Sequence, residues 1–343
     1  MTKFNWPTTG NENRLLELEN DFESKRISHA YLFSGPMEVG KLTAAKFFGQ
    51  LLICRNQGCR ECEDCKLIRA NTHPNFTLVD ELWIEGVNED LETLARKSNF
   101  NQSHRTKNPK AKTDTIRIDD LREILARVNQ TSEGWKVFMI HNIERMNREA
   151  ANFFLKTLEE PPKNTIFLLT TNNQPLLLPT IVSRCRVINF GNVNPTTIDI
   201  MLRDKFSNLT EEELNRVVNF SMGKPIRAIR LAENSTAFRE FKEYFEKLKN
   251  LVEKPNIAEK LAFAEKVSVN NMEVQKFLEN FTYFLRSFML TRARQPVANS
   301  RYTPRKLVEL IRQLDSTRGL IERNVNLRLT VENLLLNIGI SRN

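Results

Sequence analysis

One stretch near the N-terminus constrains the fold of this 343-residue chain more than any other. An apolar run at 31–33 leads into the segment 34–43, which reads SGPMEVGKLT. Gly35, Gly40 and Lys41 have the spacing of a phosphate-binding P-loop, G-x-x-x-x-G-K-[ST]. In such a loop, backbone N–H groups surround phosphates at the N-terminus of a helix. The stretch therefore predicts a buried strand, a phosphate-type loop and a helix that begins near residue 42.

The residues that would support a metal ion in this site are replaced. Leu42 stands where a Ser or Thr hydroxyl would hold Mg²⁺, and the next hydroxyl is one residue late because each helical residue turns by ~100°. A strand predicted at 136–140 ends in His141 and Asn142, where a P-loop ATPase carries acidic residues for the metal shell and the attacking water. Glu144 follows two residues later, and we assign it to the next loop. The sequence therefore predicts that this chain does not hydrolyse ATP, and it leaves nucleotide binding undecided.

Four of the five cysteines fall within twelve residues, in the pattern C-x4-C-x2-C-x2-C. They are Cys54, Cys59, Cys62 and Cys65. Four thiolates in tetrahedral coordination form a structural Zn²⁺ site. Disulfides would need an oxidising compartment, and the N-terminus lacks the apolar segment of a secretory signal. An iron–sulfur site is less favoured, because Arg69-Ala70 stand where a ferredoxin run would continue with cysteine and proline. We interpret Cys185 as a small buried side chain.

The order of elements predicts the architecture. We expect strands near 76–80, 136–140, 166–170 and 186–190, and helices over 11–30, 42–53 and from Asn147 to 158, with another that begins at Asp119. Alternating strands and helices favour a parallel, doubly wound α/β sheet through residue 190. Only helical patterns follow Asn194. We therefore predict an α/β core at 1–190, a small helical lid at 191–235 and an all-helical domain at 236–343.

The charge balance suggests a phosphate-bearing or acidic partner. The net charge is +9 and the isoelectric point is about 9.3, which fits such partners as well as a merely basic soluble protein. Six Lys or Arg and no acid lie between Arg96 and Lys112. We interpret this stretch as a solvated loop, with a polyanion contact as the alternative. No apolar run approaches ~18 residues, so we expect no membrane contact and a cytoplasmic protein.

The set of motifs resembles the delta-prime subunits of the bacterial DNA polymerase III clamp loader, which have an AAA+ fold. The matching stretches are 29–36, the cysteine cluster, 72–74, 116–119, 145–147, 158–162, 170–173, 178–185 and 324–335. The resemblance implies a non-hydrolysing subunit with a structural zinc module at about 54–65, although that family usually has a longer gap than the one between Cys54 and Cys59. It also implies that 236–343 is a collar domain that drives oligomerisation.

The same resemblance implies a role for Ser183-Arg184-Cys185 in a neighbouring subunit. In the family this motif supplies an arginine finger to the adjoining motor subunit, and a planar guanidinium suits bidentate binding of phosphate oxygens. The implied partners are the gamma/tau and delta subunits and, through the complex, the sliding clamp and primer–template DNA. The implied process is ATP-dependent loading of the clamp on primed DNA during replication.

Two other functions remain open at this point. One is an active AAA+ ATPase, such as a gamma/tau-like motor subunit or a branch-migration helicase, which Mg²⁺-dependent ATP turnover by the isolated chain would reveal. The other is a stand-alone zinc-containing nucleic-acid binder, which tight and salt-sensitive DNA binding would reveal.

Overall fold

The computed structural model describes residues 2–79, 116, 118, 121–122, 134–253, 256–269, 271–294, 303–321 and 326–338. The basic stretch 96–112 and most of the helix predicted from Asp119 lie outside these residues. The chain forms two compact units, Met1–Ala232 and Glu233–Asn343. The predicted division of the first unit into a core and a lid, at residue 190, stays a prediction.

Unit 1 is built on a five-stranded sheet in the order β2-β3-β4-β1-β5. The strands are β1 (Ala30–Ser34), β2 (Phe76–Val79), β3 (Lys136–Ile140), β4 (Thr165–Thr171) and β5 (Arg186–Asn189). Every pairing is parallel, with Leu32 opposite Leu169 of β4 and Val187 of β5. All residues of β1, β2 and β4 are buried, as expected when helices cover both faces of a parallel sheet. The predicted α/β class is confirmed.

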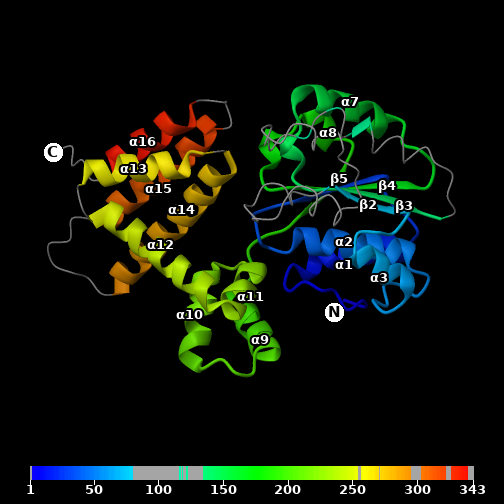
Figure 1. Ribbon diagram of the computed structural model, residues 1–343, viewed down its shortest axis with the longest axis horizontal. Helices are drawn as coiled ribbons and strands as arrows, with labels where there is room; N and C mark the ends of the chain where they lie inside the picture. The colour runs from blue at the N-terminus through cyan, green and yellow to red at the C-terminus, as the bar shows by residue number, and fades with distance from the viewer. Residues whose placement is uncertain are drawn as a thin grey trace. The chain divides into compact units, whose positions relative to one another are not determined.

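Helices cover the two faces of this sheet (Figure 1). On one face lie α1 (Glu12–Glu23), α2 (Lys41–Ile53) and α3 (Glu63–Arg69). On the other face lie η1 (Ile143–Arg145), α7 (Arg148–Glu159) and α8 (Pro179–Val182), and the short η2 (Gln174–Leu176) precedes α8 in the chain. The helix predicted over 11–30 is too long. It ends at Glu23 because Lys25 has a left-handed φ of 55°, a conformation that no helix interior accepts.

Among the described residues, three further helices belong to unit 1 and five to unit 2. Those of unit 1 are α9 (Pro195–Lys205), α10 (Glu211–Ser221) and α11 (Pro225–Glu233), whose last residue belongs to unit 2. Those of unit 2 are α12 (Ser235–Glu253), α13 (Ile257–Val267), α14 (Asn271–Arg294), α15 (Pro304–Ile321) and α16 (Leu327–Asn337). All described elements of unit 2 are helices. Within α14, the aromatic rings of Phe277, Phe281, Phe284 and Phe288 stack on one another in turn. Among the described helices, none is both long and apolar enough to span a bilayer.

Candidate nucleotide-type site and four-cysteine centre

The P-loop forms the turn between β1 and α2 and needs both of its glycines. Gly35 has a φ of 144° and Gly40 a φ of 96°, both in the region that side chains rarely adopt. A Cβ on Gly35 would lie 2.1 Å from the carbonyl oxygen of Phe190, and one on Gly40 would lie 2.1 Å from Thr8 Oγ1. The loop therefore keeps the backbone of a phosphate-binding turn, packed closely against its own chain.

The ammonium group of Lys41 is bonded to three oxygen atoms of the protein. Its Nζ donates to the carbonyl oxygen of Gly35 at 2.7 Å, to Asn172 Oδ1 at 3.0 Å and to the carbonyl oxygen of Pro36. The residue is only 4% exposed. A lysine ammonium has three donors, so these three oxygens match its full capacity. The P-loop lysine is thus satisfied by the fold itself.

The positions after β3 carry neutral groups, as the sequence predicts. Asn142 Oδ1 accepts a bond from Asn172 Nδ2 at 2.8 Å, which extends the network that starts at Lys41. Thr170 Oγ1 accepts from the backbone N–H of Asn142 at 3.0 Å and lies 2.6 Å from His141 Nδ1. Burial, and then the charges of Lys41 and Arg145, lower the pKa of His141 to about 3. The imidazole therefore stays neutral at physiological pH.

Glu144 corrects one prediction. We assign it to a loop from the sequence, but it lies in η1, and its Oε1 accepts the backbone N–H of Asn172 at 2.9 Å. Burial raises its pKa, against the opposing effects of the Asn172 amide and the Lys41 charge. The carboxyl therefore belongs to the same polar network as Lys41. Sequence spacing alone misses it because η1 turns the chain back towards β4.

A second acidic residue of the loop, Glu38, binds two arginines of α11. Its carboxylate lies 2.7 Å from Arg227 Nε and 2.6 Å from Arg230 Nη2, and its carbonyl oxygen accepts the N–H of Ile226 at 3.2 Å. Although burial alone would raise the pKa of Glu38, these arginines lower it overall. Because Arg227 is 189 residues away in the sequence, no local pattern predicts this contact.

Leu42 and Thr43 lie together at the first turn of α2. Leu42 packs against the apolar cluster between the sheet and α1–α3. Both side chains line a cleft beside α3. The residue in the position of the Mg²⁺ ligand therefore contributes to packing.

The four predicted zinc ligands come together at the other end of α2. Their sulfur atoms all lie within 4.8 Å of one another, with 3.6 Å from Cys54 to Cys62, 3.8 Å from Cys54 to Cys59 and 4.0 Å from Cys59 to Cys65. Tetrahedral Zn–S bonds of about 2.3 Å place neighbouring sulfurs ~3.8 Å apart. A disulfide would bring two of them to about 2 Å. The spacing fits a four-thiolate Zn²⁺ site, and Cys54 lies in the cluster despite the short gap to Cys59. Its role as the fourth ligand stays a prediction.

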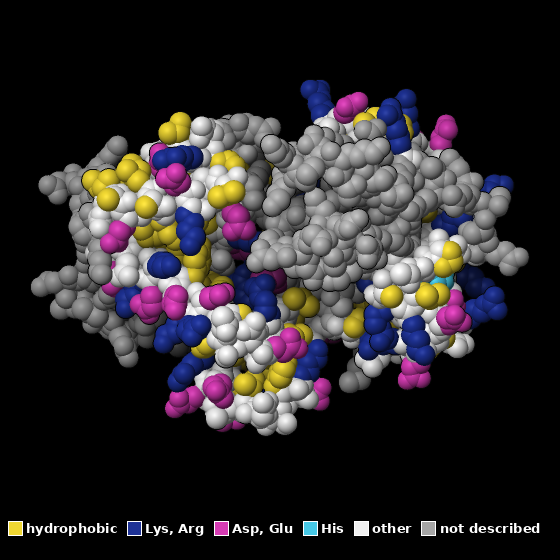
Figure 2. All heavy atoms as spheres, viewed as in Figure 1, with side chains coloured by type: hydrophobic (Ala, Val, Ile, Leu, Met, Phe, Trp, Pro, Cys, Tyr) yellow, Lys and Arg dark blue, Asp and Glu magenta, His cyan; other side chains and the backbone are white. Residues whose placement is uncertain are grey.

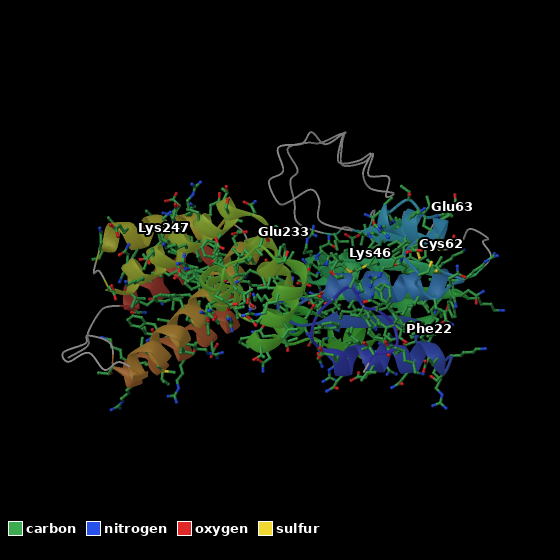
Figure 3. All side chains as sticks on the ribbon, turned by 90° about the horizontal axis from the view of Figure 1, so that it is seen from below. Phe22, Lys46, Cys62, Glu63, Glu233 and Lys247 are labelled. Atoms are coloured by element: carbon green, nitrogen blue, oxygen red, sulfur yellow. The ribbon has the colours of Figure 1, made fainter. Side chains whose placement is uncertain are left out.

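Backbone N–H groups donate to two of the sulfur atoms, although burial raises the pKa of Cys65 to about 12. The N–H of Cys62 donates to Cys59 Sγ at 3.4 Å, and the N–H of Arg60 donates to Cys65 Sγ at 3.3 Å. Hydrogen bonds from the backbone amides of Glu61 and Cys62 lower the pKa of Cys59 to about 6. Figure 3 shows Cys62 and Glu63 at the start of α3, beside the α2 helix that carries Lys46. Cys185 lies outside this cluster and is half-buried, not fully buried as predicted. Desolvation raises the pKa of its thiol to about 12.

Arg184 lies after α8 and has a partner in its own chain. Its Nη2 is 2.7 Å from Glu159 Oε1, and its Nη1 donates to the carbonyl oxygen of Thr180 at 2.9 Å. The side chain is 34% exposed, and neighbouring Ser183 donates to the same carbonyl at 3.2 Å. The sequence indicates no partner for Arg184 within its own chain, so the ion pair with Glu159 is a contact that the sequence does not predict. The arginine-finger role stays a prediction.

The fold and the loop define a class of protein. A parallel sheet with β1 between β4 and β5, and a P-loop between β1 and α2, form the P-loop-type α/β core of the AAA+ class. A family model described as "DNA polymerase III, delta subunit" matches residues 10–194, more than half of the chain. The chain belongs to this family of DNA polymerase III subunits, which confirms the resemblance drawn from the sequence.

Curated relatives include both delta-prime and tau subunits. The chain is 33% identical over 164 residues to the delta-prime subunit of Pseudomonas aeruginosa, a match that covers 46% of this chain and 42% of the relative. It is 32% identical over 185 residues to that of Bacillus subtilis (53% and 48% covered) and 30% identical over 195 residues to the tau subunit of that organism (55% and 29%). The chain thus spans just under half the length of these two delta-prime relatives.

Solved structures that the chain matches include a RuvB variant and a polymerase-related protein, both from Thermotoga maritima. The RuvB Thr-to-Val variant gives a TM-score of 0.49 at 14% identity, covering 82% of this chain and 88% of that one. The DNA polymerase III gamma subunit-related protein gives 0.45 at 17% identity, covering 94% and 98%.

Proposed function

We propose that this chain is the non-hydrolysing, delta-prime-type subunit of a DNA polymerase III clamp loader. In this role it supports ATP-dependent loading of the sliding clamp on primed DNA and leaves hydrolysis to gamma/tau motor subunits. The partners are gamma/tau and delta, with the clamp and primer–template DNA reached through the complex. Family membership and the delta-prime relatives support this assignment.

The state of Lys41 is the observation that carries the non-hydrolysing part of the proposal. The lysine that would bind β- and γ-phosphates in a P-loop ATPase has its three donors on protein oxygens. Leu42 supplies no hydroxyl to a metal, and His141 and Asn142 supply no carboxylate. These three positions therefore offer Mg²⁺ none of the ligands that they supply in such an ATPase.

Arg184 is the residue through which the chain would affect hydrolysis in a neighbour. It is exposed enough to reach another surface, and its guanidinium is held at the end of α8 by Glu159 and Thr180. An arginine supplied in trans stabilises the charge on the transferring phosphoryl group and raises rates by ~10³–10⁵ in well-studied systems. We propose that residues 1–190 present Arg184, that 191–235 form the lid and that 236–343 form the collar.

Reconstitution of the loader tests this function. The chain should co-purify with gamma/tau and delta. Arg184→Ala should leave zinc content and assembly unchanged and reduce clamp- and DNA-stimulated ATP turnover several-fold. The loss should be partial, because the other motor interfaces carry their own arginines. Arg184→Lys should not restore full turnover, since an ammonium lacks the bidentate fork.

Glu159→Gln is the matched control. It breaks the same internal ion pair but keeps the guanidinium. If Arg184 acts only through that pair, both variants will behave alike, and the role in trans is wrong. Failure to assemble with gamma/tau and delta would contradict the whole assignment, and tight DNA binding by the isolated chain would favour a stand-alone nucleic-acid binder.

A further inference from the structure

A basic cleft with an apolar floor lies between α2 and the four-cysteine module. Its volume is about 470 Å³, within the usual range of ~300–1,000 Å³ for ligand sites. The walls come from the first turns of α2, from the end of α3 and from the cysteine loop. Figure 3 labels Lys46 on the α2 side and Cys62 on the module side. All of these residues belong to unit 1.

Three cations line this cleft. Arg69 is exposed, and its Nη2 donates to the carbonyl oxygen of Arg60 at 2.6 Å. Arg60 in turn donates to the carbonyl oxygen of Asn5, and Lys46 Nζ donates to the carbonyl oxygen of Arg69 at 3.2 Å. Within the described residues, neither Arg60 nor Arg69 has a carboxylate within ion-pair distance. The two guanidiniums therefore keep charge that a partner's acidic group can neutralise.

The floor of the cleft is apolar and offers no free aromatic face. Leu42, Phe47 and Ile68 line it, but Phe47 is 3% and Ile68 0% exposed, so half-buried Leu42 supplies its accessible surface. The guanidinium of Arg60 covers the Phe47 ring at 5.1 Å from its centroid, and Trp6 packs against that ring at 5.0 Å. Proteins that bind single-stranded nucleic acid stack its bases on aromatic side chains. Covered in this way, Phe47 cannot provide that platform, so the apolar floor favours a protein side chain.

We propose that this cleft binds an acidic segment of a partner protein, with carboxylates on Arg69, Arg60 and Lys46 and one apolar side chain on half-buried Leu42. Carboxylates match the forked guanidinium donors in geometry and charge. Charge complementarity gives selectivity for the partner and raises the association rate, while the apolar contact slows dissociation. In this proposal Leu42 contacts the partner's apolar side chain, which is a role separate from the P-loop. The inference does not depend on the proposed loader function.

Fluorescence anisotropy of a labelled twelve-residue peptide of alternating aspartate and leucine, titrated with the full chain, tests the cleft. We expect saturable binding that weakens with salt. Arg69→Glu should reduce affinity about tenfold or more, because it replaces a charge-assisted bond with repulsion. Leu42→Ser should reduce affinity several-fold at unchanged charge. Arg148→Glu, an exposed arginine of α7 on the opposite face of the sheet, is the matched control and should change affinity less than about twofold.

Three outcomes would overturn the proposal. The first is an equal loss with Arg69→Glu and Arg148→Glu, and the second is equal binding of an all-glutamate peptide, since either would mean that charge alone attracts the probe. The third is tighter binding of a twelve-nucleotide oligo-dT that displaces the peptide, which would assign the cleft to nucleic acid. Zinc content and the melting temperature of each variant confirm folding. If Arg69→Glu does not fold, Arg69→Gln gives the same comparison.

Discussion

The two ends of α2 differ in whether the residues of a metal site are present. Gly40 precedes the first residue of the helix, and Cys54 follows the last. At the first end, the positions that would support a metal are held by Leu42, His141 and Asn142. At the other end, all four predicted metal ligands are present, with their sulfur atoms within 4.8 Å of one another. One helix thus joins an incomplete catalytic-type site to a complete structural-type site.

The difference shows what each site needs in order to persist. A structural metal site contributes its binding free energy to folding, so the loss of any one ligand weakens the fold. A phosphate loop can keep its shape without the ligand if other groups satisfy its polar atoms. Here Asn172 and two loop carbonyls bind Lys41, and Arg227 and Arg230 bind Glu38. Internal partners thus hold the polar groups of this loop.

The largest effect should come from the cysteines. Full-length protein should contain one Zn²⁺ per chain, and both Cys54→Ser and Cys62→Ser should lose it. The free energy of unfolding of unit 1 should fall by more than about 4 kcal/mol, because ligation is part of folding. Metal analysis and thermal melts measure both quantities.

Cys185→Ala is the matched control for the metal, because this cysteine lies outside the cluster. It should keep one Zn²⁺ per chain. Full metal content in Cys54→Ser would show that the fourth ligand is another residue. Iron in place of zinc would contradict the assignment of the site.

The next effect concerns the loop end of α2. Glu38→Gln should destabilise the attachment of α11 by about 3 kcal/mol, because it leaves Arg227, 5% exposed, without its charged partner. Hydrogen exchange of the α11 amides measures this change. Glu212→Gln is the control, since its pair with Arg216 is exposed on both sides and should be worth less than about 0.5 kcal/mol. Equal effects of the two substitutions would mean that the loop is held by something other than this ion pair.

Local sequence patterns predict the cysteine end of α2 better than the contacts at its loop end. The glycine spacing and the cysteine spacing each lie within a short segment, so the turn and the ligand set follow from local chemistry. The apolar runs predict the buried strands for the same reason. The contacts of Glu38 with Arg227 and of Lys41 with Asn172 join residues 189 and 131 positions apart. They depend on the order of the strands and on the position of α11, which no local pattern contains.

A smaller effect should appear in acid. The pKa of His141 is about 3 in the folded protein, below its ordinary value of 6.5. Between these values the unfolded chain binds more protons, so the free energy of unfolding should fall as pH decreases from about 6.5 towards 3. The loss is at most about 1.4 kcal/mol per pH unit, or roughly 2 kcal/mol by pH 5. Urea unfolding at several pH values should show a shallower slope for His141→Gln. An unchanged slope would mean that this imidazole is accessible to protons in the fold.

ATP turnover by the isolated, zinc-loaded chain with Mg²⁺ is the most direct test of the central claim, that the loop end of α2 keeps its shape without catalysis. We predict no turnover above the level of the Lys41→Ala variant. That variant removes the only P-loop ammonium while leaving the distant cysteine cluster intact, so a preparation with full zinc content serves as its own folding control. Turnover that exceeds this background and disappears in Lys41→Ala would show that the site is catalytic, and the chain would then be a motor subunit.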